Sequence, residues 1–336
     1  MTQYETMYEQ KKMTAEQALQ LIQDHDYMFS AQASGEPAAI LDKLQYLKET
    51  GVKDTIINTC LPLKDYPWLH DQEMKGTMFH NGWFFCGPLR QSQKEKLTSA
   101  VPQRSTTILR HTLDRIRYEG RRPVVLATVS PMDKNGYMTL SVSAIYERDL
   151  INAGALTIVE VNPNFPRTFG DTLVHISEVA AVVESDRPIP CAKLAPYTET
   201  DAAIGRYIAE LIEDGSTIQL GIGNIPNAVA NELKAKKHLG IHTEMFTETM
   251  VDLIECGAVD NSQKGFMNGY SVCSFTMGSQ RLYDFINNNP SVLFKSSTFS
   301  NDPYTIGRNN KFVSINASLE IDLTGQCASE TVGNLQ

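Results

Sequence analysis

The chain has 336 residues, of which 42% are hydrophobic and 21% are charged. These proportions are ordinary for a globular protein and argue against a collagen-like, coiled-coil or disordered chain. The chain carries 30 Lys and Arg residues against 39 Asp and Glu residues, a formal net charge of -9. This balance argues against a general nucleic-acid-binding protein, because such proteins are usually basic. At about 150 residues per domain, the length predicts two domains.

The cysteines, the apolar runs and the N-terminal residues bear on the compartment. The six cysteines form no CxxC pair and have no histidine at zinc-finger spacing, so we interpret them as reduced thiols. The main apolar or nearly apolar runs, 124–129 and 156–161, span six residues, whereas a membrane-spanning helix needs about 20. Residues 1–12 are polar and mixed in charge, unlike a targeting peptide. We therefore predict a cytoplasmic protein with no membrane or nucleic-acid partner.

The first half of the chain alternates helical and strand patterns. Thr14 is placed to cap a helix over 14–24, with Gln17 completing a capping box. Residues 37–50 predict a helix closed by Gly51. Strands are predicted at 54–60 and at the two apolar runs, which are typical of central parallel strands buried on both faces.

A proline-rich segment separates the two halves. Residues 186–196 hold three prolines in eleven positions, and proline removes backbone donors and fixes φ, so we interpret this segment as a linker. The linker divides the chain into predicted domains 1–188 and 189–336.

The second half repeats the alternation, with an apolar helical face over 203–212. The further predicted helices and strands are 217–220, 227–236, 239–243, 247–255, 279–287, 293–295, 312–315 and 319–323. The fold class expected for the whole chain is therefore α/β, with two open, mostly parallel sheets.

A glycine turn is the most informative local motif. Gly221-Ile222-Gly223-Asn224-Ile225-Pro226 follows a predicted strand and precedes a predicted helix. Glycines let a backbone approach a ligand closely, and a helix N-terminus offers N–H donors and partial positive charge, so a phosphate or thioester ligand fits. A dinucleotide site is a second interpretation, because Glu244 lies 23 residues after Gly221, but Pro226 replaces the third glycine of that fingerprint. A plain structural turn is the third.

Glu244 ends the next predicted strand, where open α/β sheets place their chemistry. It is a candidate nucleophile, a candidate general base, or a solvated residue at a strand end. His242 lies two residues earlier, on the same face of a strand. A His–Glu pair can bind a metal, but no third ligand is spaced nearby, so we predict no metal site.

Six segments, in order along the chain, together resemble the acetyl-CoA hydrolase/transferase family of CoA-transferases (family I). That family includes butyryl-CoA:acetate and 4-hydroxybutyrate CoA-transferases. The segments are 129–137, 158–167, 174–178, 219–227, 239–245 and 315–326. The resemblance implies two CoA-transferase-like domains, with Glu244 as the nucleophile. It also implies that coenzyme A is bound by Gly221, Ile222, Gly223, Asn224, Ile225 and Leu319. Asn224 stands where the family turn usually has a glycine.

The resemblance further implies an acyl-CoA:carboxylate CoA-transferase, with butyryl-CoA or a similar short-chain acyl-CoA and acetate as substrates. The reaction would be ping-pong through a glutamyl-CoA thioester on Glu244. It needs no permanently bound cofactor, since the coenzyme A thioester is the substrate, and the expected assembly is a homo-oligomer. An acyl-CoA hydrolase is the alternative within the fold. An inactive fragment and an NAD-binding Rossmann protein are the alternatives of other classes.

Two further expectations follow from the same resemblance. Residues 34–38 look like the family loop before its first long helix, and they either line the acyl pocket or form an ordinary turn. Relatives in this family extend further at the C-terminus, so the second domain is expected to be incomplete relative to the family.

Overall fold

The computed structural model describes residues 2–192, 196–329 and 331 of the chain. These residues divide by their internal contacts into two compact units. Unit 1 comprises the described residues up to Pro190, together with Ser274–Met277 and Ile286–Phe299. Unit 2 comprises the described residues of Cys191–Cys273, Gly278–Phe285 and those from Ser300 onward.

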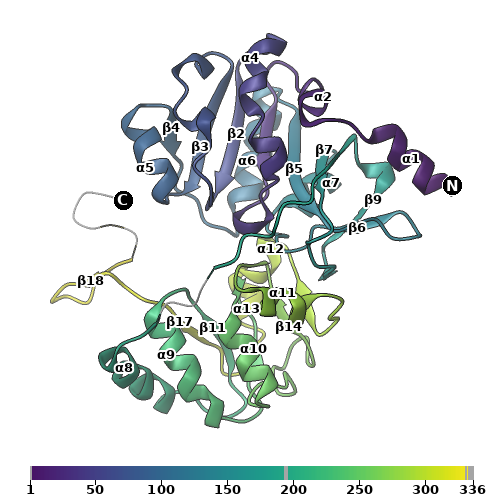
Figure 1. Ribbon diagram of the computed structural model, residues 1–336. Coiled ribbons are helices and arrows are strands. Elements are labelled where there is room, and N and C mark those ends of the chain that lie inside the picture. Colours follow the sequence, from purple (N-terminus) through teal and green to yellow (C-terminus); the bar gives the residue numbers. More distant parts are fainter. Residues whose placement is uncertain (1, 193–195, 330, 332–336) are drawn as a thin grey trace. The chain divides into compact units, whose positions relative to one another are not determined.

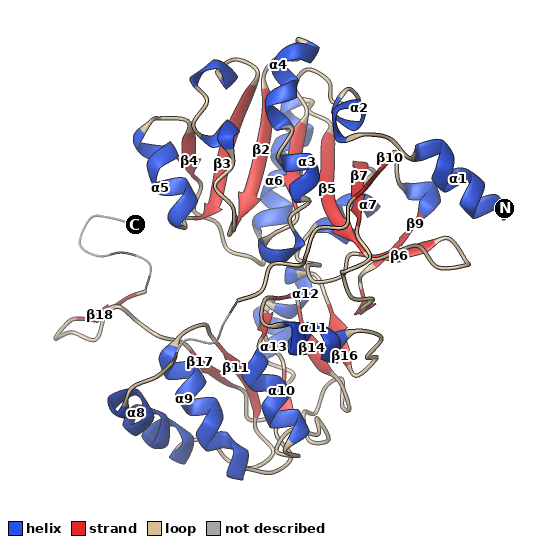
Figure 2. Cartoon of the chain, in the orientation of Figure 1, coloured by secondary structure: helices blue, strands red, loops and turns tan. Residues whose placement is uncertain are grey.

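Unit 1 is built on a seven-stranded sheet with the order β10-β7-β5-β1-β2-β3-β4. Every neighbouring pair is parallel, and Figure 2 shows the strands as adjacent red arrows. The strands are β1 (Tyr27–Ser30), β2 (Thr55–Cys60), β3 (Met78–Phe84), β4 (Thr98–Ala100), β5 (Pro123–Val129), β7 (Leu156–Val161) and β10 (Ala181–Glu184). The predicted strands at 54–60, 124–129 and 156–161 are confirmed. Their apolar side chains, such as Val124, Leu126 and Ile158, are fully buried, as expected of central parallel strands.

The strand order of unit 1 reverses beside β1. From β1 the chain runs outward through β2, β3 and β4, and then continues on the other side through β5, β7 and β10. The carboxyl ends of β1 and β5 therefore form a topological switch point, where open α/β sheets bind ligands. The loop that leaves β1 carries residues 34–38.

Two helices of unit 1 precede β1, the others lie between these strands in the sequence, and they lie beside the sheet in space (Figure 1). They are α1 (Gln3–Lys11), α2 (Ala15–Leu19), α3 (Ala38–Leu41), α4 (Leu47–Thr50), α5 (Gly87–Lys94), α6 (Ile108–Glu119) and α7 (Glu147–Asn152). The remaining short elements are β6 (Tyr137–Thr139), β8 (Phe169–Gly170), β9 (Leu173–His175), β15 (Phe275–Thr276), β16 (Val292–Phe294) and α12 (Ser297–Ser300).

Two predicted helices of this unit have different limits in the structure. Thr14 and Gln17 form the predicted capping box, but α2 ends at Leu19 instead of at position 24. The Asp26 carboxylate accepts the Gln23 N–H at 2.7 Å, so this N–H is not available to extend the helix. The helix predicted over 37–50 is split into α3, a 3₁₀ turn and α4, and it is closed by Gly51 at φ 80° as predicted.

Unit 2 is built on a parallel three-stranded sheet with the order β12-β11-β17. Its elements are α8 (Glu199–Glu210), β11 (Thr217–Leu220), α9 (Asn224–Glu232), β12 (Gly240–Ile241), β13 (Met245–Phe246), α10 (Glu248–Glu255), β14 (Ser271–Cys273), α11 (Gln280–Ile286), α13 (Pro303–Ile306), β17 (Val313–Ile315), β18 (Glu320–Ile321) and β19 (Cys327–Ala328). The two open, mostly parallel α/β sheets predicted from the sequence are thus present.

Three predictions in unit 2 are corrected by the structure. The helix predicted to begin at 227 begins at Asn224, so the last residues of the glycine turn form its first turn. The strand predicted over 239–243 is reduced to Gly240–Ile241. Helix α8 packs against α9 through Gly205, whose missing side chain lets the α9 backbone approach closely. Tyr207 and Leu211, predicted on the apolar inner face, are 70% and 80% exposed.

Within the residues that the structure describes, no helix combines the length and the apolar character needed to span a membrane.

Candidate active site

The carboxyl edge of the unit 2 sheet collects most of the predicted site residues. Strand β11 pairs in parallel with β12 through Ile218 and Ile241, and with β17 through Leu220 and Ile315. Because parallel strands end at the same edge, the segments that follow them leave the sheet there. These segments are the glycine turn after β11, Glu244 after β12 and Asn316 after β17. The fold therefore brings the turn and the carboxylate to one edge.

The glycine turn has a backbone that presents donors at this edge. Gly223 caps α9 with φ 131° and ψ -178°, a conformation essentially confined to glycine. The Gly221 N–H donates to the Ile315 carbonyl at 2.8 Å, which fixes the start of the turn. The N–H groups of Asn224 and Ile225 fall in the first helical turn, where α-helix geometry supplies no carbonyl partner. They are therefore aligned with the positive end of the helix dipole.

Glu244 is half-buried and lies between the buried residues Thr243 and Met245. Its segment is anchored by backbone hydrogen bonds, because the His242 N–H donates to the Ile218 carbonyl at 3.2 Å and the Thr243 N–H to the Val272 carbonyl at 2.9 Å. A carboxylate on a fixed backbone and only partly in contact with water is suited to nucleophilic attack.

His242 is buried beneath this edge and does not share the exposure of Glu244. Its Nε2–H donates to the Ser300 carbonyl at 2.8 Å, while Nδ1 has no hydrogen-bond partner among the described residues. Burial, together with the nearby charge of Lys264, lowers the pKa of His242 to about 4. The ring is therefore neutral near pH 7 and makes a structural contact through Nε2. Across residues 2–192 and 196–329, no group of three or more His, Cys, Asp and Glu side chains is arranged to hold a metal ion.

The segment after β17 carries the last predicted site residue. Asn316 donates through Nδ2 to the Gln219 Oε1 at 3.1 Å and to the Ser314 Oγ at 3.1 Å. This polar network is exposed and joins the ends of β11 and β17. Leu319 is 60% exposed, and its N–H donates to the Ala328 carbonyl at 2.8 Å. Leu319 therefore belongs to the β18–β19 hairpin.

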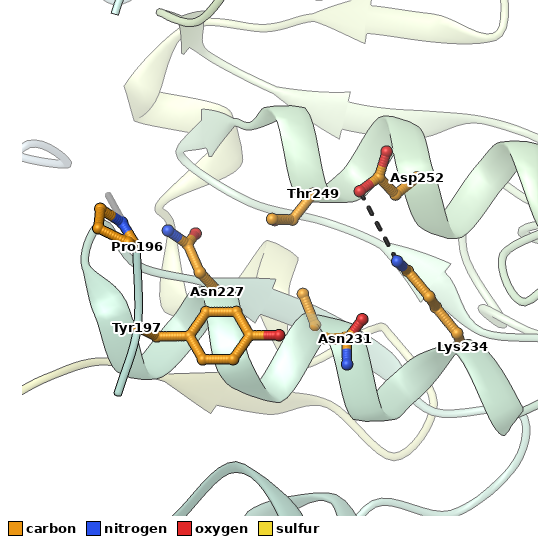
Figure 3. Close-up of a pocket in the computed structure, with 8 residues that line it drawn as sticks. Pro196, Tyr197, Asn227, Asn231, Lys234, Thr249 and Asp252 are labelled. Carbon is orange, nitrogen blue, oxygen red and sulfur yellow. Dashed lines mark ion pairs between the residues drawn. The ribbon is translucent and has the colours of Figure 1, made fainter. Parts of the chain in front are cut away.

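A polar pocket of about 450 Å³ lies in unit 2 between α9 and α10 (Figure 3). It is lined by Pro196, Tyr197, Asn227, Ala230, Asn231, Lys234, Thr249 and Asp252. Lys234 and Asp252 face each other with a Nζ–Oδ2 distance of 3.9 Å. Asp252 also accepts from Arg281 Nη1 at 2.7 Å, and the same guanidinium bonds to Glu248 and Glu255. The site residues predicted from the sequence, 221–225, Glu244 and Leu319, do not line this pocket.

In unit 1, the loop after β1 is fixed by buried polar contacts. The Arg187 guanidinium bonds to Glu160 Oε1 at 2.7 Å and also donates to the Glu36 carbonyl oxygen, while the Ala39 N–H donates to Glu160 Oε2 at 2.8 Å. The Glu36 side chain is 5% exposed and accepts at Oε2 from the Leu63 N–H at 3.1 Å. Burial raises the pKa of Glu36 to about 8, so the carboxyl is mostly protonated at neutral pH.

The sequence analysis did not predict that the side chains of Glu36 and Lys264 are buried. Glu36 lies in a Gly- and Pro-containing loop, and Lys264 lies in the polar stretch 260–265. Such stretches usually indicate exposed turns. Both side chains are nevertheless buried, because partners distant in the sequence surround them.

Comparison with known families decides the classification of the chain. The model of the acetyl-CoA hydrolase/transferase N-terminal domain matches residues 1–192, and the model of the C-terminal domain of the same family matches residues 278–336. The chain belongs to the acetyl-CoA hydrolase/transferase family. Its enzyme class is that of the CoA-transferases, as the resemblance of the six segments implied. The glycine turn and Glu244 lie between the two matched ranges.

Similar proteins extend over nearly the whole chain. A succinyl-CoA:cyclohexane-1-carboxylate CoA transferase from Geobacter metallireducens is 38% identical over 335 residues, which are 99% of this chain and 75% of the relative. A 4-hydroxybutyrate coenzyme A transferase from Clostridium kluyveri is 36% identical over 98% of this chain and 76% of its own. Among solved structures, RipA from Yersinia pestis matches with a TM-score of 0.91 and 32% identity, covering 98% of this chain and 78% of RipA.

Proposed function

We propose that the protein is an acyl-CoA:carboxylate CoA-transferase that uses Glu244 as its nucleophile. The observation that carries the proposal is the placement of Glu244 at the same sheet edge as the glycine turn, in a chain of the CoA-transferase class. A carboxylate nucleophile needs nearby donors for the charge that develops on the attacked carbonyl oxygen. The N–H groups of Asn224 and Ile225 are the candidates for these donors.

The proposed reaction conserves the thioester through two half-reactions. The Glu244 carboxylate attacks the acyl-CoA carbonyl carbon, the C–S bond breaks, and a mixed acyl–glutamyl anhydride and the coenzyme A thiolate form. The thiolate then attacks the glutamyl carbonyl and releases the first carboxylate, which leaves a glutamyl-CoA thioester. An incoming carboxylate attacks this thioester and expels the thiolate, which finally takes the new acyl group and frees Glu244. No ATP or metal ion enters the balance.

The chain's own residues would supply binding and charge stabilisation. We propose that coenzyme A is bound along Gly221, Ile222, Gly223, Asn224 and Ile225, with Leu319 contacting it from the hairpin after β17. The loss of one oxyanion donor typically lowers kcat by about 10²–10³-fold. Ile222 is 60% exposed between the two glycines, which leaves its side chain accessible to an apolar part of the ligand.

The substrates proposed are short-chain acyl-CoA thioesters, such as butyryl-CoA, with acetate as one carboxylate. The names of the relatives show that acyl groups of different shape are used within the family. The assignment of butyryl-CoA and acetate to this chain, like its cytoplasmic location and its homo-oligomeric state, stays a prediction.

The experiment that tests this function measures two products from one reaction of butyryl-CoA with acetate. We expect acetyl-CoA to form faster than free thiol and the kinetics to be ping-pong, with parallel double-reciprocal lines. Glu244→Gln, which keeps the size of the side chain, should lose the transfer. Release of free thiol without acetyl-CoA would assign a hydrolase instead. Tight binding in an NADH titration would contradict the coenzyme A assignment of the glycine turn.

A further inference from the structure

The strand that precedes Glu244 pairs with β11 on one side and is held on the other by two isolated backbone bridges, at Leu239 and His242, and by side chains. On the first side, the Gly240 N–H donates to the Ser216 carbonyl at 2.9 Å and the His242 N–H to the Ile218 carbonyl at 3.2 Å. In a parallel ladder the residue between them, Ile241, directs its N–H and C=O to the opposite side. That side belongs to the outer edge of β12, which is the last strand of its sheet.

The two outward groups of Ile241 are met by two buried side chains. The Ile241 N–H donates to Asn261 Oδ1 at 2.9 Å, and the Ile241 carbonyl accepts from Lys264 Nζ at 2.9 Å. Asn261 is 5% exposed and Lys264 is 0% exposed. Between the backbone bridges at Leu239 and His242, these two side chains supply one acceptor and one donor to Ile241.

Both side chains are themselves tied to the segment that leads into β14. Lys264 Nζ donates to the Tyr270 carbonyl at 2.7 Å, and Asn261 Nδ2 donates to Ser271 Oγ at 3.1 Å. The same segment receives the Thr243 N–H at Val272. The backbone on both sides of His242 is thus connected to residues 270–272.

Lys264 packs against Gly240, which has no side chain to occupy the same space. A Cβ added to Gly240 would lie 2.2 Å from Lys264 Cγ, which is far inside van der Waals contact. Lys264 Nζ is held by two backbone carbonyl oxygens, those of Ile241 and Tyr270.

We propose that Asn261 and Lys264 are positioning residues, which hold Ile241 through its N–H and carbonyl groups and thereby fix the attacking position of Glu244. The inference rests on the proposed function, because it assigns these residues a part in the same reaction. Glu244 follows Ile241 by three positions, and a misplacement of about 1 Å can cost about 10²-fold in rate. A loosened Ile241 should therefore slow the attack while leaving the ligand-binding turn intact.

The test compares Lys264→Met, which keeps the apolar stem and removes the donors, with Asn261→Leu and Asn261→Asp. We expect Lys264→Met and Asn261→Leu to slow formation of the glutamyl-CoA thioester by about 10- to 100-fold, with little change in KM for acyl-CoA. Asn261→Asp keeps an oxygen acceptor for the Ile241 N–H and should recover most of the rate. Leu253→Ala, at a fully buried position of α10, is the control for a general loss of stability.

Amide hydrogen exchange of the peptide over 240–246 provides a readout that does not depend on activity. It should accelerate in Lys264→Met and Asn261→Leu, and change less in Leu253→Ala and Asn261→Asp. Unchanged exchange, or thioester formation within about twofold of wild type in folded Lys264→Met and Asn261→Leu, would overturn the inference. If Lys264→Met does not fold, the two Asn261 variants decide. If wild type forms no thioester, the proposed function fails, while hydrogen exchange still decides whether the side chains hold Ile241.

Discussion

The sheets of the two units hold their loops in different ways. In unit 1, β5 has seven residues and pairs with β1 over 123–126 and with β7 over 124–129. In unit 2, β12 has two residues, and on its outer side Ile241 is bonded by the side chains of Asn261 and Lys264. A loop that follows a long strand is held by many backbone hydrogen bonds. The segment of Glu244 follows a short strand and depends on fewer hydrogen bonds. A substitution at a single contact should therefore displace the segment of Glu244 more than a loop of the unit 1 sheet.

The units also differ in the charge that they bury. Unit 1 encloses the Arg187–Glu160 ion pair beside the Glu36 carboxyl, and unit 2 encloses the Lys264 ammonium. Removal of one partner from a buried ion pair strongly destabilises the fold, because the remaining charge stays buried away from water. The charged form of a lone buried amine is instead destabilised by its desolvation.

The largest effect is expected at the ion pair of unit 1. Arg187→Met leaves Glu160, which is 0% exposed, without its cation and should lower the free energy of unfolding by about 3–5 kcal/mol. Both tryptophans, Trp68 and Trp83, lie in unit 1, so urea unfolding followed by tryptophan fluorescence reports this unit. Lys12→Met is the control, since it removes an ion pair with Glu184 that is exposed to solvent and contributes little to stability. Equal losses in the two variants would refute the role given to burial.

The next effect is expected at the short strand of unit 2. Gly240→Ala places a methyl group against Lys264, so we expect a loss of about 1–3 kcal/mol, as for overpacking, and slower transfer. Circular dichroism during urea unfolding measures the stability. Gly87→Ala is the control, because a Cβ there meets no atom within 4 Å. Wild-type stability and rate in Gly240→Ala would mean that Lys264 is not held tightly against this strand.

The two buried ionisable groups should respond to pH with opposite signs. Burial lowers the pKa of Lys264 from 10.5 to about 7, so between these values the unfolded chain binds more protons and stability rises with pH. Burial raises the pKa of Glu36 from 4.5 to about 8, so between these values the folded chain binds more protons and stability falls as pH rises. Each slope is at most about 1.4 kcal/mol per pH unit.

The measurement is urea unfolding of wild type, Lys264→Met and Glu36→Gln at several pH values. The stability of wild type relative to Lys264→Met should rise from pH 7 toward pH 10, and its stability relative to Glu36→Gln should fall from pH 5 toward pH 8. Differences that do not vary with pH would show that these side chains ionise as they do in water.

The sequence predicted the parts of both units that depend on local pattern. The strands at 124–129 and 156–161, the glycine turn and the position of Glu244 after a strand all follow from apolar runs and turn residues close together in the chain. The side-chain bonds on the outer side of β12 could not be predicted, because Asn261 and Lys264 come about twenty residues later in the chain. For the same reason the burial of Glu36 was missed, since Arg187 and Leu63 are distant in sequence.

The smallest effect is expected in the pocket between α9 and α10. Lys234 lies 3.9 Å from Asp252, which already bonds to Arg281, so Lys234→Met should change stability by less than about 0.5 kcal/mol. Transfer activity should also stay near that of wild type. A raised KM for acyl-CoA would show instead that this pocket is part of the coenzyme A site.

The most direct measurement of the central claim is mass spectrometry of the protein after incubation with acyl-CoA and no acceptor carboxylate, followed by borohydride. Trypsin should release Glu244 in the peptide 238–264, which also contains Glu248 and Glu255, so fragmentation must locate the modified residue. We predict a coenzyme A adduct on Glu244 that borohydride reduces to an alcohol, and no adduct in Glu244→Ala. An adduct on Glu248 or Glu255, or one that persists in Glu244→Ala, would contradict the account.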